Sequence, residues 1–305
     1  MVAIKQATSA KKGRRFALLM AARDSEYVLK KYGGYRNVFL AAFGDAAAGE
    51  TWDLYRAIDG ELPAQEDIEK YDGFVISGSP NDAYANDEWI LRLCRLIRDL
   101  HARRKRVLGV CFGHQVICRA LGGRVAKSST GWDIGIREVA VADMSLPRQC
   151  RFLEALRDQL PPRAKITEIH QDEVRSMKAF LEHFTLIFHD ITWCMHHAWT
   201  RYDNTLYMLE QVWEVPAGAE VLASSAKTGV EMFRVGEHLL GIQGHPEYTN
   251  DILISLVDRL LGAGTITVSV AEAVKKQLAA TGPDREFWLK LCKSFLKADQ
   301  MDISI

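Results

Sequence analysis

Short apolar runs alternate with amphipathic stretches through the first half of the chain. The runs typical of buried parallel strands lie at residues 16–22, 52–58, 73–77 and 106–110. Between them, apolar positions recur at helical spacing, as at Ile90, Leu93, Ile97 and Leu100. Residues 24–43 and 113–121 also have helical patterns, the first interrupted by Gly33 and Gly34. This alternation predicts a doubly wound, mostly parallel sheet whose active loops lie at the carboxyl ends of the strands.

The second half of the chain is richer in strands and ends in helices. Short, turn-bounded segments typical of antiparallel strands lie at residues 136–142, 165–169, 220–224 and 230–235. A further apolar strand is expected at 239–243, and apolar stripes predict three helices from Asn250 onward. The pattern therefore predicts an α/β fold in which a small antiparallel subsheet and C-terminal helices accompany the parallel sheet.

The domain organisation follows from these elements. Residues 1–14 are polar and basic without an apolar run, which predicts a disordered tail and excludes a secretory signal. Residues 15–264 are expected to form the catalytic domain, and residues 265–305 a helical extension. No synthetase domain is expected in the chain, because only helical sequence follows the last strand.

Composition and charge exclude several classes of partner. Lys plus Arg and Asp plus Glu each number 39, so the formal net charge is zero, which argues against a nucleic-acid binder. No apolar run approaches the roughly 18 residues that span a bilayer, so no membrane partner is expected. The six cysteines show no paired spacing and are expected to be reduced thiols of a cytosolic protein.

The strongest local signal for chemistry surrounds Cys111. An apolar strand runs directly into Gly109-Val110-Cys111-Phe112-Gly113, and a helix follows. This is the nucleophile-elbow arrangement, with cysteine in place of serine. A sharp turn lifts the sulfur clear of the sheet, and the N–H groups at the start of the helix favour a thiolate. A buried structural cysteine at a strand end is the alternative interpretation of the motif taken alone.

A cysteine nucleophile needs a base, and the base needs a partner that orients it. His245 follows the strand at 239–243, Pro246 fixes the turn, and Glu247 lies two residues further on. The imidazole can face the sulfur while the carboxylate accepts its other N–H. Cys111, His245 and Glu247 are therefore predicted to form a catalytic triad.

These motifs resemble the class I glutamine amidotransferases, whose fold is a flavodoxin-like, doubly wound sheet. The resemblance rests on the segment 111–115 (CFGHQ), on 244–247 (GHPE) and on 75–80 (VISGSP). It implies that the backbone N–H groups of Gly78 and Phe112 form the oxyanion hole. It also implies that Gln115 lies near the glutamyl group.

Within this family, the sequence most specifically resembles the plant γ-glutamyl peptidases. Shared segments include 32–35 (YGGY), 87–90 (DEWI), 170–174 (HQDEV) and 284–288 (DREFW). Those enzymes remove the γ-glutamyl residue from glutathione conjugates on the way to sulfur-containing defence metabolites such as glucosinolates. The resemblance implies a cysteine hydrolase that acts through a γ-glutamyl thioester on a small-molecule substrate, without a cofactor. His170, Gln171 and Asp172 are assigned to substrate binding, with a capped turn as the structural alternative.

Two other functions stay open on the sequence alone. A glutaminase subunit that supplies ammonia to a separate synthetase would use the same residues. The second alternative is an inactive binding protein on the same fold, although the intact triad argues against it.

The segment 174–211 breaks the pattern of the chain. It is aromatic-rich, follows neither a helical nor a strand period, and interrupts a connection between strands where loops are short. Val-Arg at its start and Gln at its end can be encoded by splice-site sequences. The hypothesis is a retained in-frame intron or a gene-model error, with a genuine insertion as the alternative. Its histidines and Cys194 match no zinc-site spacing, so no metal is expected.

Overall fold

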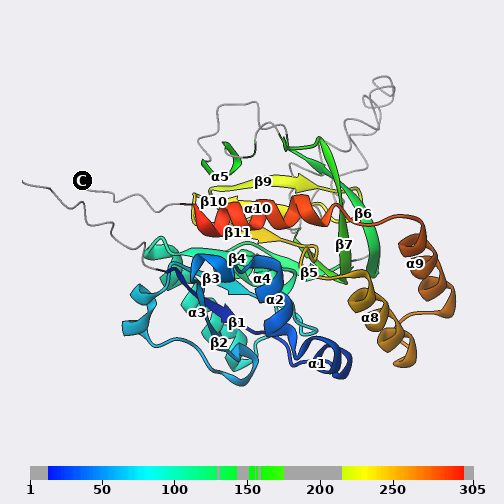
Figure 1. Ribbon diagram of the computed structural model, residues 1–305, viewed down its shortest axis with the longest axis horizontal. Helices are drawn as coiled ribbons and strands as arrows, with labels where there is room; N and C mark the ends of the chain where they lie inside the picture. Colours follow the sequence, from blue (N-terminus) through cyan, green and yellow to red (C-terminus); the bar gives the residue numbers. More distant parts are fainter. Residues whose placement is uncertain are drawn as a thin grey trace, which may run out of the picture.

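The protein folds around one mixed sheet with helices on both faces (Figure 1). A computed structural model describes residues 13–128, 131–142, 151–154, 156, 159–174 and 215–298. The tail at 1–12 and the atypical segment from 175 to its end at 211 lie outside the described residues. Within the described ranges, no helix combines the length and apolar character needed to cross a bilayer.

Five adjacent strands of the nine-stranded sheet are parallel. In spatial order they are β2 (Thr51–Tyr55), β1 (Arg15–Leu19), β3 (Gly73–Ile76), β4 (Arg106–Val110) and β11 (Leu239–Ile242). All five runs were predicted as strands. β2 is shorter than the run predicted at 52–58, because a 3-10 turn at Ala57–Asp59 with Gly60 in the left-handed region ends it. Because β3, β4 and β11 are parallel neighbours, their carboxyl ends meet at one edge of the sheet.

Four antiparallel strands continue the same sheet beyond β11. They are β10 (Met232–Val235), β9 (Ala219–Ser224), β6 (Asp133–Val141) and β7 (Arg163–His170), in that order. A separate two-stranded sheet pairs β5 (Val125–Lys127) with β8 (Asp172–Val174). The predicted α/β class is confirmed, and the antiparallel subsheet is continuous with the parallel strands.

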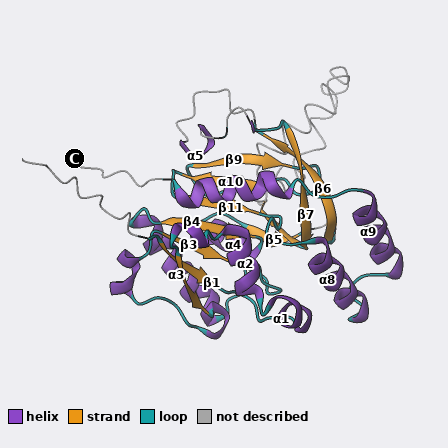
Figure 2. Ribbon diagram, viewed as in Figure 1, coloured by secondary structure: helices purple, strands orange, loops and turns teal. Residues whose placement is uncertain are grey.

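Alternate residues of β1 explain why both faces of the sheet are covered. Phe16 and Leu18 belong to one core cluster, and Ala17 and Leu19 belong to the other, because successive side chains of a strand point to opposite faces. The first cluster contains residues of α2 (Tyr35–Phe43) and α10 (Arg285–Lys297), and the second contains residues of α3 (Glu88–Ala102) and α4 (Phe112–Ala120). Figure 2 shows α10 lying along the strands.

The remaining helices lie at the ends of the sheet. α1 (Glu26–Tyr32) precedes α2, and the two are separated by Gly33 and Gly34, as predicted. α8 (Asn250–Gly262) and α9 (Val268–Ala280) pack together against β6 through a third apolar cluster. The short helix α5 (Arg151–Glu154) contacts α10. Three helices follow Asn250, which confirms the predicted number within the described ranges.

Candidate active site

Cys111 sits at a strained turn between β4 and α4. Its backbone has φ 53° and ψ −105°, a conformation that side chains rarely adopt and that is typical of a nucleophile elbow. Its N–H donates to the carbonyl of Ile242 at 2.8 Å, which ties the turn to β11. A Cβ on Gly113 would lie 2.4 Å from the carbonyl oxygen of Ile76, so glycine lets α4 begin close to β3. The elbow predicted from the sequence is therefore present.

The structure places His245 and Glu247 beside this cysteine. The Nδ1–H of His245 donates to Oε1 of Glu247 at 2.7 Å, and the imidazole lies beside Cys111, since both side chains border Gly78. All three residues are buried. Burial alone lowers the pKa of His245, but the charges of Glu247 and Cys111 raise it well above its ordinary value. The arrangement favours the imidazolium form of His245.

The turn after β11 holds the histidine in place. The N–H of His245 donates to the carbonyl of Thr167 at 2.8 Å, which ties the turn to β7. The ring of Tyr248 stacks on the imidazole, with centroids 4.1 Å apart and planes 5° apart. The imidazole is thus fixed by the backbone of His245, by the carboxylate of Glu247 and by an aromatic face, which limits its rotation.

Gly78 and Phe112 lie where the resemblance expects an oxyanion hole. Ser77 anchors the loop, since its hydroxyl accepts from the N–H of Ala21 at 2.8 Å and donates to the carbonyl of Gly78 at 3.0 Å. Phe112 is the first residue of α4, where backbone N–H groups lack partners within the helix. A Cβ on Gly78 would lie 2.9 Å from Cε1 of His245 and 3.6 Å from Cβ of Cys111. The Gly78 backbone therefore borders the reacting groups.

Substituting Gly78 with alanine is expected to lower kcat roughly 100-fold, because a shifted loop would move the Gly78 N–H away from the predicted oxyanion position. The new methyl group collides with the imidazole of His245, so either the ring or the loop must shift. Steady-state kinetics and thermal unfolding check this. Gly262→Ala is the matched control, because nothing lies within 4 Å of the added Cβ. Equal activity of the two variants would contradict the placement of Gly78.

A cavity of about 320 Å³ opens over the sulfur. Gln115, His170, Gln171 and Asp172 all line it together with Cys111 and His245, so the structure gathers every residue assigned to substrate binding. Sequence analysis assigned no role to several other lining residues, among them Arg23, Asp82, Trp132 and Arg259. Of these four, Asp82 left a usable signal, because it follows Gly78 on the same loop.

Asp82 and Asp172 form an acidic side of this cavity. Burial raises the pKa of Asp172 to about 6, and the charge of the neighbouring Asp82 carboxylate adds to the increase. Two neighbouring carboxyl groups disfavour each other's negative charge, and a cationic ligand group between them offsets that repulsion. This side of the cavity therefore suits an ammonium group.

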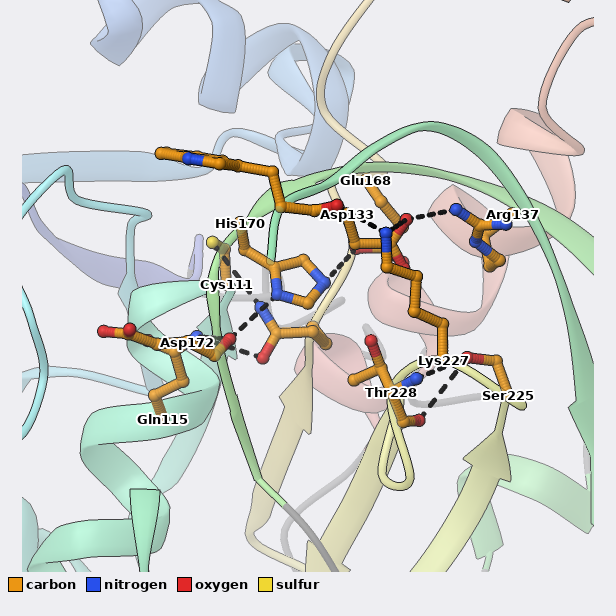
Figure 3. A network of polar contacts seen from close by, with 12 residues as sticks. Cys111, Gln115, Asp133, Arg137, Glu168, His170, Asp172, Ser225, Lys227 and Thr228 are labelled. Atoms are coloured by element: carbon orange, nitrogen blue, oxygen red, sulfur yellow. Dashed lines mark hydrogen bonds and ion pairs between the residues drawn. The ribbon is translucent and has the colours of Figure 1, made fainter. Parts of the chain in front are cut away.

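A second group of buried polar residues adjoins His170, which lines the cavity (Figure 3). Nε2 of His170 is 3.3 Å from Glu168, and the buried carboxyl group of Glu231 lies close enough to Glu168 to be affected by its charge. Burial raises the pKa of Glu168 to about 8, with the charge of Asp133 as a further cause. Asp133 is ion-paired with Arg137. Among the residues the structure describes, no group of three or more His, Cys, Asp or Glu has an arrangement that could hold a metal ion.

A cysteine elbow with a His–Glu pair at the ends of adjacent parallel strands defines a cysteine hydrolase of the α/β class. Residues 55–252 match the family described as glutamine amidotransferase class-I. The chain belongs to this family, as its motifs predicted.

Individual relatives refine the comparison. The chain is 40% identical over 284 residues to γ-glutamyl peptidase 3 of Arabidopsis thaliana, covering 93% of this chain and 97% of that protein. It is also 40% identical over 284 residues to γ-glutamyl peptidase 5 of the same plant, covering 93% and 96%. The resemblance to the plant γ-glutamyl peptidases is confirmed.

Solved structures agree with the fold. A glutamine amidotransferase from Thermotoga maritima superposes with a TM-score of 0.58 at 16% identity, covering 94% of this chain and 100% of that one. A glutamine amidotransferase from Methylobacillus flagellatus gives a TM-score of 0.58 at 18% identity, covering 95% and 96%. These similarities support the fold class predicted from the sequence.

Proposed function

We propose that this protein is a cysteine hydrolase that removes the γ-glutamyl residue from glutathione or its S-conjugates. The observation that carries the proposal is the imidazole of His245, which lies beside Cys111 and donates its Nδ1–H to Glu247 in the wall of an open cavity. The relatives named γ-glutamyl peptidases support the substrate bond.

The first half of the proposed reaction makes a thioester. The Cys111 thiolate attacks the γ-carbonyl carbon, a C–S bond forms, and the carbonyl electrons move onto oxygen, where the N–H groups of Gly78 and Phe112 hold the charge. When the intermediate collapses, the C–N bond breaks and the departing amine takes a proton from the His245 imidazolium. The raised pKa of His245 keeps that proton available at neutral pH.

The second half regenerates the cysteine. Water enters the space left by the amine and gives a proton to His245 as its oxygen attacks the thioester carbonyl. The C–S bond then breaks, glutamate leaves, and Cys111 returns as the thiolate beside the imidazolium. These steps use protein groups and water, so the proposal needs no cofactor.

The cavity suits the γ-glutamyl group. Its α-ammonium is a cation, which matches the acidic side formed by Asp82 and Asp172. Gln115, His170 and Gln171 complete the proposed binding residues. A reducing cytosol is proposed as the location, because the six cysteines show no paired spacing in the sequence.

Glutamate release from a glutathione S-conjugate tests the proposal. The matched control is the isomeric peptide in which the same glutamate is joined through its α-carboxyl group. We expect release from the γ-linked peptide only. Release from free glutamine alone, rising when a synthetase is added, would favour the glutaminase alternative. No release from any of these substrates would overturn the hydrolase proposal.

A further inference from the structure

Gln243 lies directly beside the candidate nucleophile and has no role in the triad. It follows β11, is fully buried, and its Nε2 is 3.7 Å from Sγ of Cys111, within hydrogen-bonding distance for sulfur. Its Oε1 accepts from Nε2 of Gln115 at 3.1 Å. Both ends of the buried amide are therefore engaged, one by the sulfur and one by a neighbouring glutamine.

The orientation of the Gln243 amide follows from that of Gln115, which the backbone carbonyl of Asp172 fixes. A carbonyl oxygen can only accept, so Gln115 must turn its NH₂ group toward it, and the distance is 2.8 Å. The second hydrogen of that NH₂ group then points to Oε1 of Gln243. Gln243 is left with its own NH₂ group facing the sulfur. Figure 3 shows Gln115, Asp172 and Cys111 grouped in this network.

The same carbonyl also accepts from Nδ1 of His170 at 2.8 Å. Two donors thus converge on the Asp172 carbonyl, and both come from buried side chains. This double contact holds the start of β8 against α4. Because Gln115 cannot turn without breaking its bond to this carbonyl, the donor end of Gln243 is held toward Cys111.

We infer that Gln243 is a positioning residue that donates an N–H group to the sulfur of Cys111 and stabilises its thiolate. The inference rests on the proposed function, because it treats Cys111 as the nucleophile. Gln243 gives the sulfur a donor in addition to the neighbouring imidazole of His245. A hydrogen bond to a charged sulfur is stronger than one to a neutral thioester. Gln243 therefore favours the thiolate before attack and again when the thioester is hydrolysed.

Several charged and titratable side chains also face this sulfur. His245, Glu247 and Tyr248 come from the turn after β11, and the cavity around Cys111 is lined by Arg23, Asp82, His170, Asp172 and Arg259. All of them remain in a variant of Gln243 alone. A change in the pH dependence of Cys111 in such a variant consequently reports on the lost N–H group.

The test is the rate at which iodoacetamide alkylates Cys111, followed by mass spectrometry across a pH series on the full chain. In Gln243→Leu we expect the midpoint of the profile to rise by about one pH unit, so that alkylation below the midpoint is about tenfold slower. Gln243→Met, which keeps the length of the side chain, should shift in the same direction and serves as a second variant if the leucine variant is unstable.

Gln277→Leu is the matched control. Gln277 makes two hydrogen bonds to the backbone of Ile136, with distances of 2.9 and 2.7 Å, in α9 and away from Cys111. Its loss should lower the melting temperature while the alkylation profile stays unchanged. An unshifted midpoint in either folded Gln243 variant would overturn the inference. A shifted midpoint in a protein that hydrolyses no γ-glutamyl peptide would instead overturn the proposed function alone.

Discussion

Replacing Cys111 with alanine is expected to abolish the release of glutamate from a γ-glutamyl peptide, lowering kcat by on the order of 10⁴-fold or more. The expected loss is large because the proposed reaction forms a covalent bond to Sγ, and alanine has no atom that can form it. The remaining groups still bind the substrate, so KM should change much less. Steady-state kinetics with a glutathione S-conjugate measures both quantities.

Two controls separate chemistry from folding in this variant. Cys118→Ala removes another buried thiol of α4, whose pKa burial raises to about 12, and should keep most of the activity. Cys111→Ala itself should unfold close to the wild-type midpoint, because the small side chain leaves the turn intact. An alanine variant that keeps a tenth of wild-type activity would mean that Cys111 is not the nucleophile.

Substituting Glu247 with glutamine should lower kcat by roughly 10²- to 10⁴-fold. The carboxylate accepts Nδ1–H of His245 at 2.7 Å, which leaves Nε2 as the nitrogen that serves the cysteine. A glutamine amide can donate to Nδ1 and so stabilise the wrong tautomer, while its size and position stay the same. The variant therefore tests orientation and charge together, with little change in packing.

The pH dependence of stability provides a second measurement on the same variant. The pKa of His245 is raised in the folded protein, so its stabilising contribution is complete below the pKa of an unfolded histidine, near 6.5, and is lost as the pH rises through the folded value. Without the carboxylate charge, that raised pKa should fall. Denaturant unfolding from pH 6 to 9 should show a weaker decline for Glu247→Gln than for the wild-type protein. An identical decline would contradict the coupling.

Much of the fold was predictable because the signals are local. The short apolar runs at β1, β3 and β4 predicted buried strands. The amphipathic spacing of α3 predicted a helix, because burial of one helix face imposes a period on the sequence. The ends of elements were less certain. The second strand stops at Tyr55 because the following residues form a 3-10 turn, which apolar periodicity does not distinguish from a continuing strand.

The structure does not test the interpretation of the segment at 174–211. Its interpretation as a retained intron or a gene-model error depends on its composition and on its ends, and from residue 175 onward it lies outside the described residues. That interpretation stays a prediction. Val174 itself is the last residue of β8 and pairs with Val125, so the chain leaves the described fold beside the cavity that Asp172 lines.

The sequence by itself determined the alternation of strands and helices, the elbow at Cys111 and the pairing of His245 with Glu247. Each depends on residues within a few positions of one another, where backbone geometry follows from spacing. Only the tertiary structure decided that Asp82 meets Asp172 and that Gln243 turns its donor toward the sulfur. Those contacts join residues far apart in the chain, and a hydrophobic pattern reports that a side chain is buried without specifying its partner.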